Sequence, residues 1–157
     1  MLFGDDGFGP AVAEHLASDF RIPGDVAVVD AGTGVREVLF DLVLGEPRPE
    51  KVVIVDAVDV KGRRPGEVFT IPVDALPENK RDDFSLHQMP TSNLLKELSS
   101  MCGVKVVIVA AQVETVPAEV ALGLSGILAG AVPRGCRMVM GELTETGAAG
   151  RADKKEP

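Results

Sequence analysis

A run of four β-branched apolar residues, Val52 to Val55, constrains the fold of this chain more than any other feature. Because the run does not alternate with polar residues, both of its faces should be covered, as in an inner strand of a sheet flanked by helices. The run ends on Asp56. In open α/β sheets, ligands bind at the carboxyl ends of the strands, so Asp56 is the first candidate functional residue. A role in capping the turn after the strand would explain the same position.

Strand and helix patterns alternate along the rest of the chain. Strands are expected at 26–30, 52–56, 67–71 and 104–109, and helices at about 9–20, 35–44, 93–102 and 126–142. The link from Asp56 to the 67–71 segment is too short for a helical crossover, so that strand should run antiparallel to its partner. Pro133 predicts a kink or a break in the last helix. The pattern predicts a three-layer α/β/α sandwich with a mostly parallel, twisted sheet and one antiparallel strand.

Length and composition narrow the class of protein. The 157 residues and 45% hydrophobic content fit one globular domain, which we expect over 1–144, followed by a disordered tail over 145–157. A net charge of −8 excludes nonspecific binding to nucleic acid, which needs a basic surface. No apolar run reaches the ~18 residues of a membrane span, and no signal-peptide pattern opens the chain. We therefore expect a cytoplasmic protein with no membrane insertion.

Acidic residues and a histidine lie at junctions between the expected elements, at positions that could meet. Asp5 and Asp6 precede the first helix, Asp56 ends a strand, and His87 lies before the helix that starts near residue 93. Two carboxylates and an imidazole could bind a divalent transition metal with open positions, or could act as acid and base. Capping of the first helix would account for one of the paired aspartates, because carboxylates are favoured at helix N-termini.

Other candidate chemistries have weaker sequence support. No serine lies in a GxSxG motif, so a serine hydrolase lacks its usual turn. The Gly32-Thr33-Gly34 turn after the 26–30 segment matches neither a Walker A loop nor GxGxxG, but it could hold a carbonyl or a carboxylate of a substrate. Cys102 and Cys136 lie in helix patterns and are expected to be small core residues. His15 is expected to be structural or at the surface, because no ligand-type residue flanks it at metal-ligand spacing.

Several of these segments, taken together, resemble the [NiFe]-hydrogenase maturation endopeptidases. This family removes a C-terminal peptide from the hydrogenase large subunit after nickel has been inserted, and its members are classed as aspartic-type peptidases. The matching segments occur in the family's order over nearly the whole chain, and among the family's branches we favour the one that processes coenzyme F420-reducing hydrogenases. The segments are 2–9, 30–33, 54–57, 65–66, 85–87 and 123–125.

The resemblance implies a role for each matching residue. Asp6, Asp56 and His87 match the three residues that ligate a metal in the family and that are thought to sense the nickel carried by the substrate. The same three residues are then the expected catalytic set. Asp5 would support Asp6, and the 30–34 turn would line the substrate cleft with Asp5, Asp30, Gly32, Thr33 and Gly34. The partner is a [NiFe]-hydrogenase large-subunit precursor.

One departure from the family affects the sheet. Family members begin with a strand ending in Gly-Asn, whereas Met1 directly precedes Leu2 here. We therefore expect a sheet without that first strand, and interpret the difference as a start codon assigned downstream of the natural one. Two other functions remain open. A nickel-sensing chaperone would bind the loaded precursor without cutting it, and a small-molecule α/β hydrolase would not depend on His87.

Overall fold

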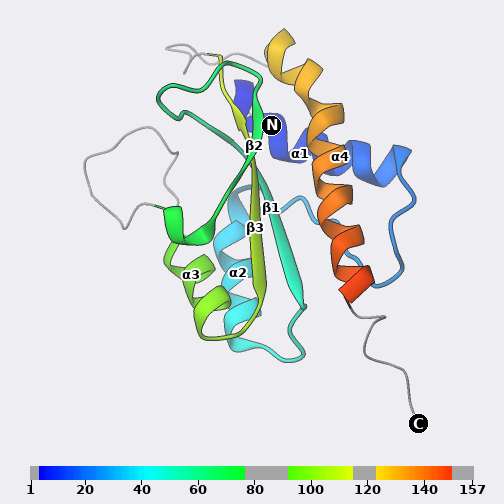
Figure 1. Ribbon diagram of the computed structural model, residues 1–157, viewed down its shortest axis with the longest axis vertical. Coiled ribbons are helices and arrows are strands. Elements are labelled where there is room, and N and C mark those ends of the chain that lie inside the picture. The colour runs from blue at the N-terminus through cyan, green and yellow to red at the C-terminus, as the bar shows by residue number, and fades with distance from the viewer. Residues whose placement is uncertain (1–3, 77–91, 115–122, 150–157) are drawn as a thin grey trace.

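The computed structural model describes residues 4–76, 92–114 and 123–149, without the side chains of 145–149. A sheet lies between two pairs of helices (Figure 1), which confirms the predicted three-layer α/β fold. None of the described helices is long and apolar enough to cross a bilayer. The helices are α1 (Phe8–Asp19), α2 (Val35–Leu44), α3 (Ser92–Ser100) and α4 (Gly126–Ala149), and the strands are β1 (Lys51–Val58), β2 (Val68–Ile71) and β3 (Lys105–Gln112).

The sheet has the strand order β1-β3-β2 in the described part of the chain. β1 and β3 are parallel and in register over their full length, from the pair Lys51 and Lys105 to the pair Val58 and Gln112. β2 is antiparallel to β3, which confirms the predicted direction of this strand. Its partner is β3, which follows it in the sequence.

The prediction that the Val52–Val55 run forms an inner strand is wrong for the described residues. There β1 pairs only with β3 and lies at the edge of the sheet, whereas β3 is central. Most β1 side chains are half-buried, while the second half of β3 is buried. A continuous apolar run indicates that both faces of a strand are covered. The prediction failed because such a run does not show whether both hydrogen-bonding edges of the strand are paired.

The predicted strand at 26–30 is also wrong. The segment has no regular secondary structure, and Val28 and Val29 are 37% and 62% exposed. β-branched residues favour extended backbone, but a strand forms only where a neighbour completes the hydrogen-bond ladder. No strand of the described chain pairs with this segment.

Two hydrophobic clusters fill the space on either side of the sheet. On one face, α1 packs against α4 and β1 through Phe8, Val12 and Leu16, which recur every four residues on one side of the helix and are all buried. On the other face, α2 and α3 contribute Leu39 and Leu98 to the second cluster. Each fully buried side chain of this size contributes about 1.5–3 kcal/mol to folding.

The last helix differs from its prediction in two ways. α4 runs through Pro133 without a break and ends at Ala149, beyond the expected helix end near 142. Pro133 faces solvent, and its missing hydrogen bond costs about 3 kcal/mol. Burial of the opposite side of the helix offsets that loss, since Leu128, Val132 and Cys136 are almost fully enclosed. Residues 150–157 of the predicted tail lie outside the described residues.

Candidate active site

A close approach of two backbones positions the start of α1 at the carboxyl end of β1. A Cβ atom on Gly9 would lie 2.6 Å from the carbonyl oxygen of Val55, so the contact requires glycine. The short 3-10 helix η1 (Gly4–Gly7) leads into α1 and contacts β1. Asp6 lies in η1, and Asp56 directly follows Val55. The fold therefore brings together the segments that bear these two predicted site residues.

The adjacent residues Asp5 and Asp6 occupy different environments. Asp5 is buried, with 6% exposure, whereas Asp6 is exposed. Asp5 Oδ1 accepts a hydrogen bond from the backbone N–H of Ser125 at 2.8 Å, and Asp5 Oδ2 accepts one from the N–H of Glu114 at 3.3 Å. The Asp5 carboxylate thus binds segments more than a hundred residues away in the chain instead of capping α1.

Asp56 lies on β1, two residues before the strand ends at Val58. Its side chain is half-buried, and its Oδ1 accepts a hydrogen bond from the N–H of Ala57 at 2.8 Å. Side chains two residues apart share a face of a strand, so Asp56 points to the same face as Ile54, which packs in the cluster of α2 and α3. The carboxylate therefore lies at the carboxyl edge of the sheet, on the side of these two helices.

Gln112 organises the same edge, although the sequence did not single it out. The residue ends β3 and is 4% exposed. Its Oε1 accepts a hydrogen bond from the N–H of Val60 at 2.8 Å, and its Nε2 donates to Asp59 Oδ1 at 2.8 Å. Gln112 thereby fixes the backbone just beyond Asp56. The only signal in the sequence was one amide residue at the end of an apolar strand.

The Pro65-Gly66 turn is held against both β3 and α4. Gly66 has a φ of +75° and donates its N–H to the Gln112 carbonyl at 2.8 Å. A Cβ atom there would lie 2.6 Å from Cγ2 of Ile127 in α4. A side chain at this position would therefore meet both strain and a clash, which explains why glycine occupies it.

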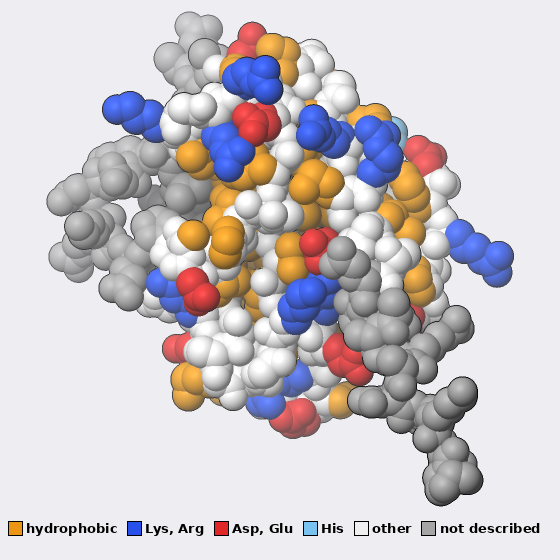
Figure 2. Space-filling view, in the orientation of Figure 1, with side chains coloured by type: hydrophobic (Ala, Val, Ile, Leu, Met, Phe, Trp, Pro, Cys, Tyr) orange, Lys and Arg blue, Asp and Glu red, His pale blue; other side chains and the backbone are white. Residues whose placement is uncertain are grey.

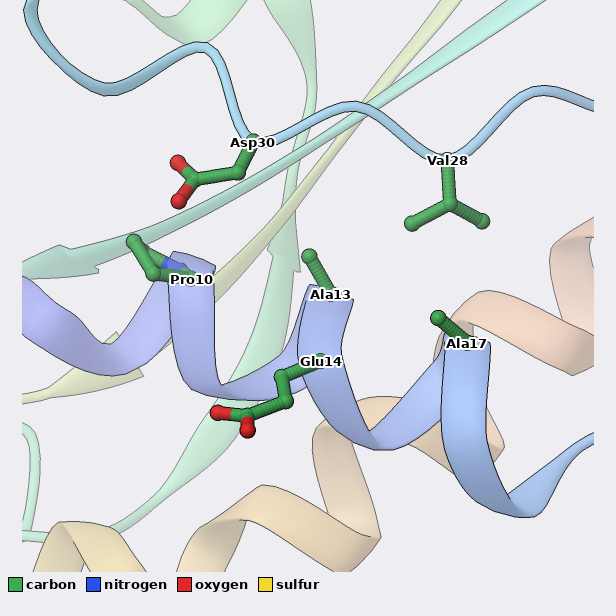
Figure 3. A pocket seen from close by; sticks show the side chains of 6 residues that line it. All are labelled: Pro10, Ala13, Glu14, Ala17, Val28 and Asp30. Atoms are coloured by element: carbon green, nitrogen blue, oxygen red, sulfur yellow. The ribbon is translucent and has the colours of Figure 1, made fainter.

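The predicted substrate-cleft residues are spread over several places. Asp30 lines a cavity of about 360 Å³ between α1 and the 26–30 segment, where it lies over Pro10 (Figure 3). Its Oδ1 also accepts a hydrogen bond from the N–H of Gly32 at 3.1 Å, and this bond shapes the turn. Asp5 and the 32–34 turn do not line the cavity, whose lining residues are Pro10, Ala13, Glu14, Ala17, Val28 and Asp30. The cleft role of these residues stays a prediction.

The third member of the predicted site, His87, lies outside the described residues. Within the described residues, no three His, Cys, Asp or Glu side chains are grouped so that they could hold a metal ion. The expected ligand set includes a residue from the undescribed 77–91 segment, so this finding does not test it. The roles of Asp6, Asp56 and His87 as metal ligands stay a prediction.

The two cysteines and His15 lie in the kinds of position predicted for them. Cys136 is fully buried and its burial raises the pKa of its thiol, while Cys102 is half-buried in the second cluster. His15 is on the exposed side of α1, with Nδ1 3.0 Å from Asp19 Oδ2.

Charged side chains of both signs are interspersed on the face shown in Figure 2, so the net negative charge does not concentrate there.

Comparisons with known proteins agree with this architecture. A hydrogenase maturation protease from Methanocaldococcus jannaschii, described as putative, is 36% identical over 145 residues, which are 91% of this chain and 90% of the relative. The coenzyme F420 hydrogenase subunit delta of Methanothermobacter thermautotrophicus is 32% identical over 149 residues, 91% of this chain and 89% of the relative.

A solved structure and a family model lead to the same assignment. The hydrogenase maturating endopeptidase HybD from E. coli superimposes with a TM-score of 0.74 at 26% identity, over 93% of this chain and 88% of that protein. The family model for hydrogenase maturation proteases matches residues 10–142. A match over this much of the sequence and the fold shows that the chain belongs to the hydrogenase maturation protease family.

Proposed function

We propose that this chain is an endopeptidase that removes a C-terminal peptide from a [NiFe]-hydrogenase large-subunit precursor after nickel has been inserted. The observation that carries the proposal is the contact of Gly9 with Val55, which brings the segment of Asp6 to the strand end that bears Asp56. In a member of a peptidase family, two carboxylates at the carboxyl edge of the sheet are suited to a hydrolytic reaction.

Nickel enters this proposal as part of the substrate. Carboxylate oxygens from Asp6 and Asp56 and a nitrogen from His87 form a donor set that suits a divalent transition metal with open positions. The precursor would offer its bound nickel to these side chains, and the scissile peptide would dock next to them. A precursor without nickel would lack this anchor, so cleavage would follow only after metal insertion.

The hydrolytic step needs a group that accepts a proton from water. A water oxygen attacks the scissile carbonyl carbon while Asp6 or Asp56 takes the proton, and the same carboxyl group then protonates the leaving amine. This assignment makes the enzyme an aspartic-type peptidase. Substrate-borne nickel would polarise the carbonyl next to it.

The relative from Methanothermobacter points to the partner. Its name assigns it to a coenzyme F420 hydrogenase, so we propose the large subunit of a hydrogenase of this type as the precursor. The reaction would take place in the cytoplasm, before the hydrogenase is assembled.

Substitution of each candidate ligand tests the site. Nickel-loaded precursor is incubated with wild-type protein, Asp6→Asn, Asp56→Asn or His87→Ala, and the precursor is followed by intact mass. Asp41→Asn is the matched control, because Asp41 is an exposed aspartate on α2. We expect the wild type and the control to release the C-terminal peptide and the three site variants to release little or none. Full cleavage by His87→Ala and both aspartate variants would contradict the proposed site.

A second function deserves a test because one similar protein is named as a hydrogenase subunit and not as a protease. A chaperone that senses nickel would bind the loaded precursor and leave its mass unchanged. Co-elution of the two proteins without any shortening of the precursor would favour this function over the peptidase.

A further inference from the structure

We propose that Asp5 is a positioning residue, which anchors the segment bearing Asp6 to the two ends of the connection between β3 and α4. The effect of this anchor on cleavage rests on the proposed function. The anchoring itself follows from the burial and contacts of Asp5, and it can be measured without a substrate.

Both carboxylate oxygens of Asp5 bind backbone N–H groups beyond the ends of regular elements. Glu114 lies two residues after the end of β3, and Ser125 directly precedes α4. The last backbone bond that extends the pairing of β1 and β3 is donated by Val113 to the Val58 carbonyl at 3.0 Å. Glu114 and Ser125 are therefore outside the ladder and the helix, where an N–H group that loses water needs another acceptor. Asp5 supplies both acceptors.

The surroundings of Ser125 favour a charged acceptor. The Oγ of Ser125 accepts a hydrogen bond from the N–H of Leu128 at 3.3 Å, so Ser125 caps the first turn of α4. The N-terminus of a helix carries partial positive charge, which an adjacent carboxylate stabilises. An asparagine in place of Asp5 would keep one acceptor oxygen and direct an NH₂ group toward the other N–H donor.

The position of Asp6 depends on this anchor because η1 is only four residues long. One side of the segment is attached through Asp5 to the start of α4, and Gly9 packs against the backbone of β1 on the other. Asp6 lies between these two attachment points. Loss of the Asp5 contacts would remove one of these two attachments, and the Asp6 carboxylate would shift relative to Asp56.

Amide hydrogen exchange of the full-length protein tests the anchor directly. In the wild type we expect the amides of Glu114 and Ser125 to be protected. In Asp5→Ala both should exchange at least about tenfold faster, as expected for loss of a hydrogen bond to a charged group. Asp5→Asn keeps one acceptor and should affect one of the two amides more than the other. Asp6→Asn is the matched control and should leave both amides protected.

A readout of cleavage separates positioning from general stabilisation. For precursor cleavage well below the unfolding temperature, Asp5→Asn should lower kcat while KM stays within about twofold, because the reacting group is displaced and not removed. Unprotected Glu114 and Ser125 amides in the wild type would overturn the proposal. Faster exchange in Asp5→Asn that also extends evenly through β3 would overturn it as well, because it would indicate global destabilisation.

The outcomes also distinguish this proposal from the proposed function. Protection of the two amides in the wild type and its loss in Asp5→Ala, together with no cleavage of the loaded precursor by the wild type, would contradict the peptidase. The anchoring role of Asp5 would still be supported.

Discussion

The sheet uses charged side chains differently at the amino ends of its parallel strands (the amino edge) and at their carboxyl ends (the carboxyl edge). At the amino edge, Lys51 begins β1 with a side chain only 5% exposed, and its Nζ donates to the Glu142 carboxylate at 2.5 Å and to the Glu142 carbonyl at 2.6 Å. This ion pair links the sheet to α4. At the carboxyl edge, the buried Asp5 and Gln112 bind mainly backbone groups of nearby loops, and the segment that bears Asp6 packs against the strand that bears Asp56. The amino edge pairs its buried lysine with a carboxylate, while the carboxyl edge uses its buried polar groups to bind loop backbone.

The largest effect on the rate of cleavage is expected from substitution of a carboxylate at the carboxyl edge. Asp56→Asn should lower the rate of precursor cleavage by at least about 100-fold, because it removes a proton acceptor and a metal-binding charge. Asparagine keeps the oxygen that accepts the bond from Ala57, so stability should change by less than about 1 kcal/mol. Cleavage kinetics and urea unfolding of the same preparation measure the two quantities. An Asp56→Asn protein that is much less stable than the wild type but cuts the precursor at the wild-type rate would contradict the expected role of Asp56.

The centre of the sheet should affect stability alone. Ile108 in β3 is fully buried, and its register partner Ile54 in β1 is half-buried. Ile108→Ala should destabilise the protein by about 2–5 kcal/mol, and Ile54→Ala by about half as much, since less surface is lost from the core. The midpoints of urea unfolding give both values. Equal losses of stability would mean that Ile54 in the outer strand β1 is as enclosed as Ile108 in the central strand β3.

The ion pair at the amino edge should also act on stability and not on chemistry. Lys51→Met leaves Glu142 without its buried lysine and should cost about 2–4 kcal/mol. The double variant Lys51→Met with Glu142→Gln should recover part of this loss, because it also removes the carboxylate charge that Lys51 neutralises. Cleavage per folded molecule should match the wild type in both variants. A single variant with unchanged stability would show that the pair contributes nothing.

The smallest effect on stability is expected from an exposed pair on α1. The hydrogen bond from His15 lowers the pKa of Asp19 below its ordinary value of 3.8, and Ser18 adds to the shift. A depressed carboxyl pKa contributes stability above 3.8, and this contribution is lost as pH falls through the folded pKa. Asp19→Asn should therefore lower the unfolding midpoint slightly at neutral pH and not at all at pH well below the folded pKa. A larger difference under acidic conditions would contradict this sign.

The sequence predicted those features that depend on local pattern. The α2 boundaries agree because glycines flank a helical apolar pattern, and β2 is antiparallel because its connection is short. The errors concern pairing between distant segments. The apolar character of Val52–Val55 could not show that β1 lies at an edge, and β-branched residues at 26–30 could not supply a partner strand.

The candidate site was predictable to a similar extent. The positions of Asp6 and Asp56 at the junctions of expected elements indicated that their segments could meet, and the fold brings those segments together. Asp5 and Asp6 could not be told apart from the sequence. The difference between them arises from hydrogen bonds to Glu114 and Ser125, which are 109 and 120 residues away from Asp5.

The central claim is that cleavage by this chain requires nickel in the precursor, and one measurement tests it most directly. Wild-type protein is mixed with the same large-subunit precursor in nickel-loaded and nickel-free forms, and the mass of each is followed with time. We expect the loaded form to lose a C-terminal peptide and the nickel-free form to stay intact. Equal cleavage of both forms, or cleavage of neither, would contradict the account.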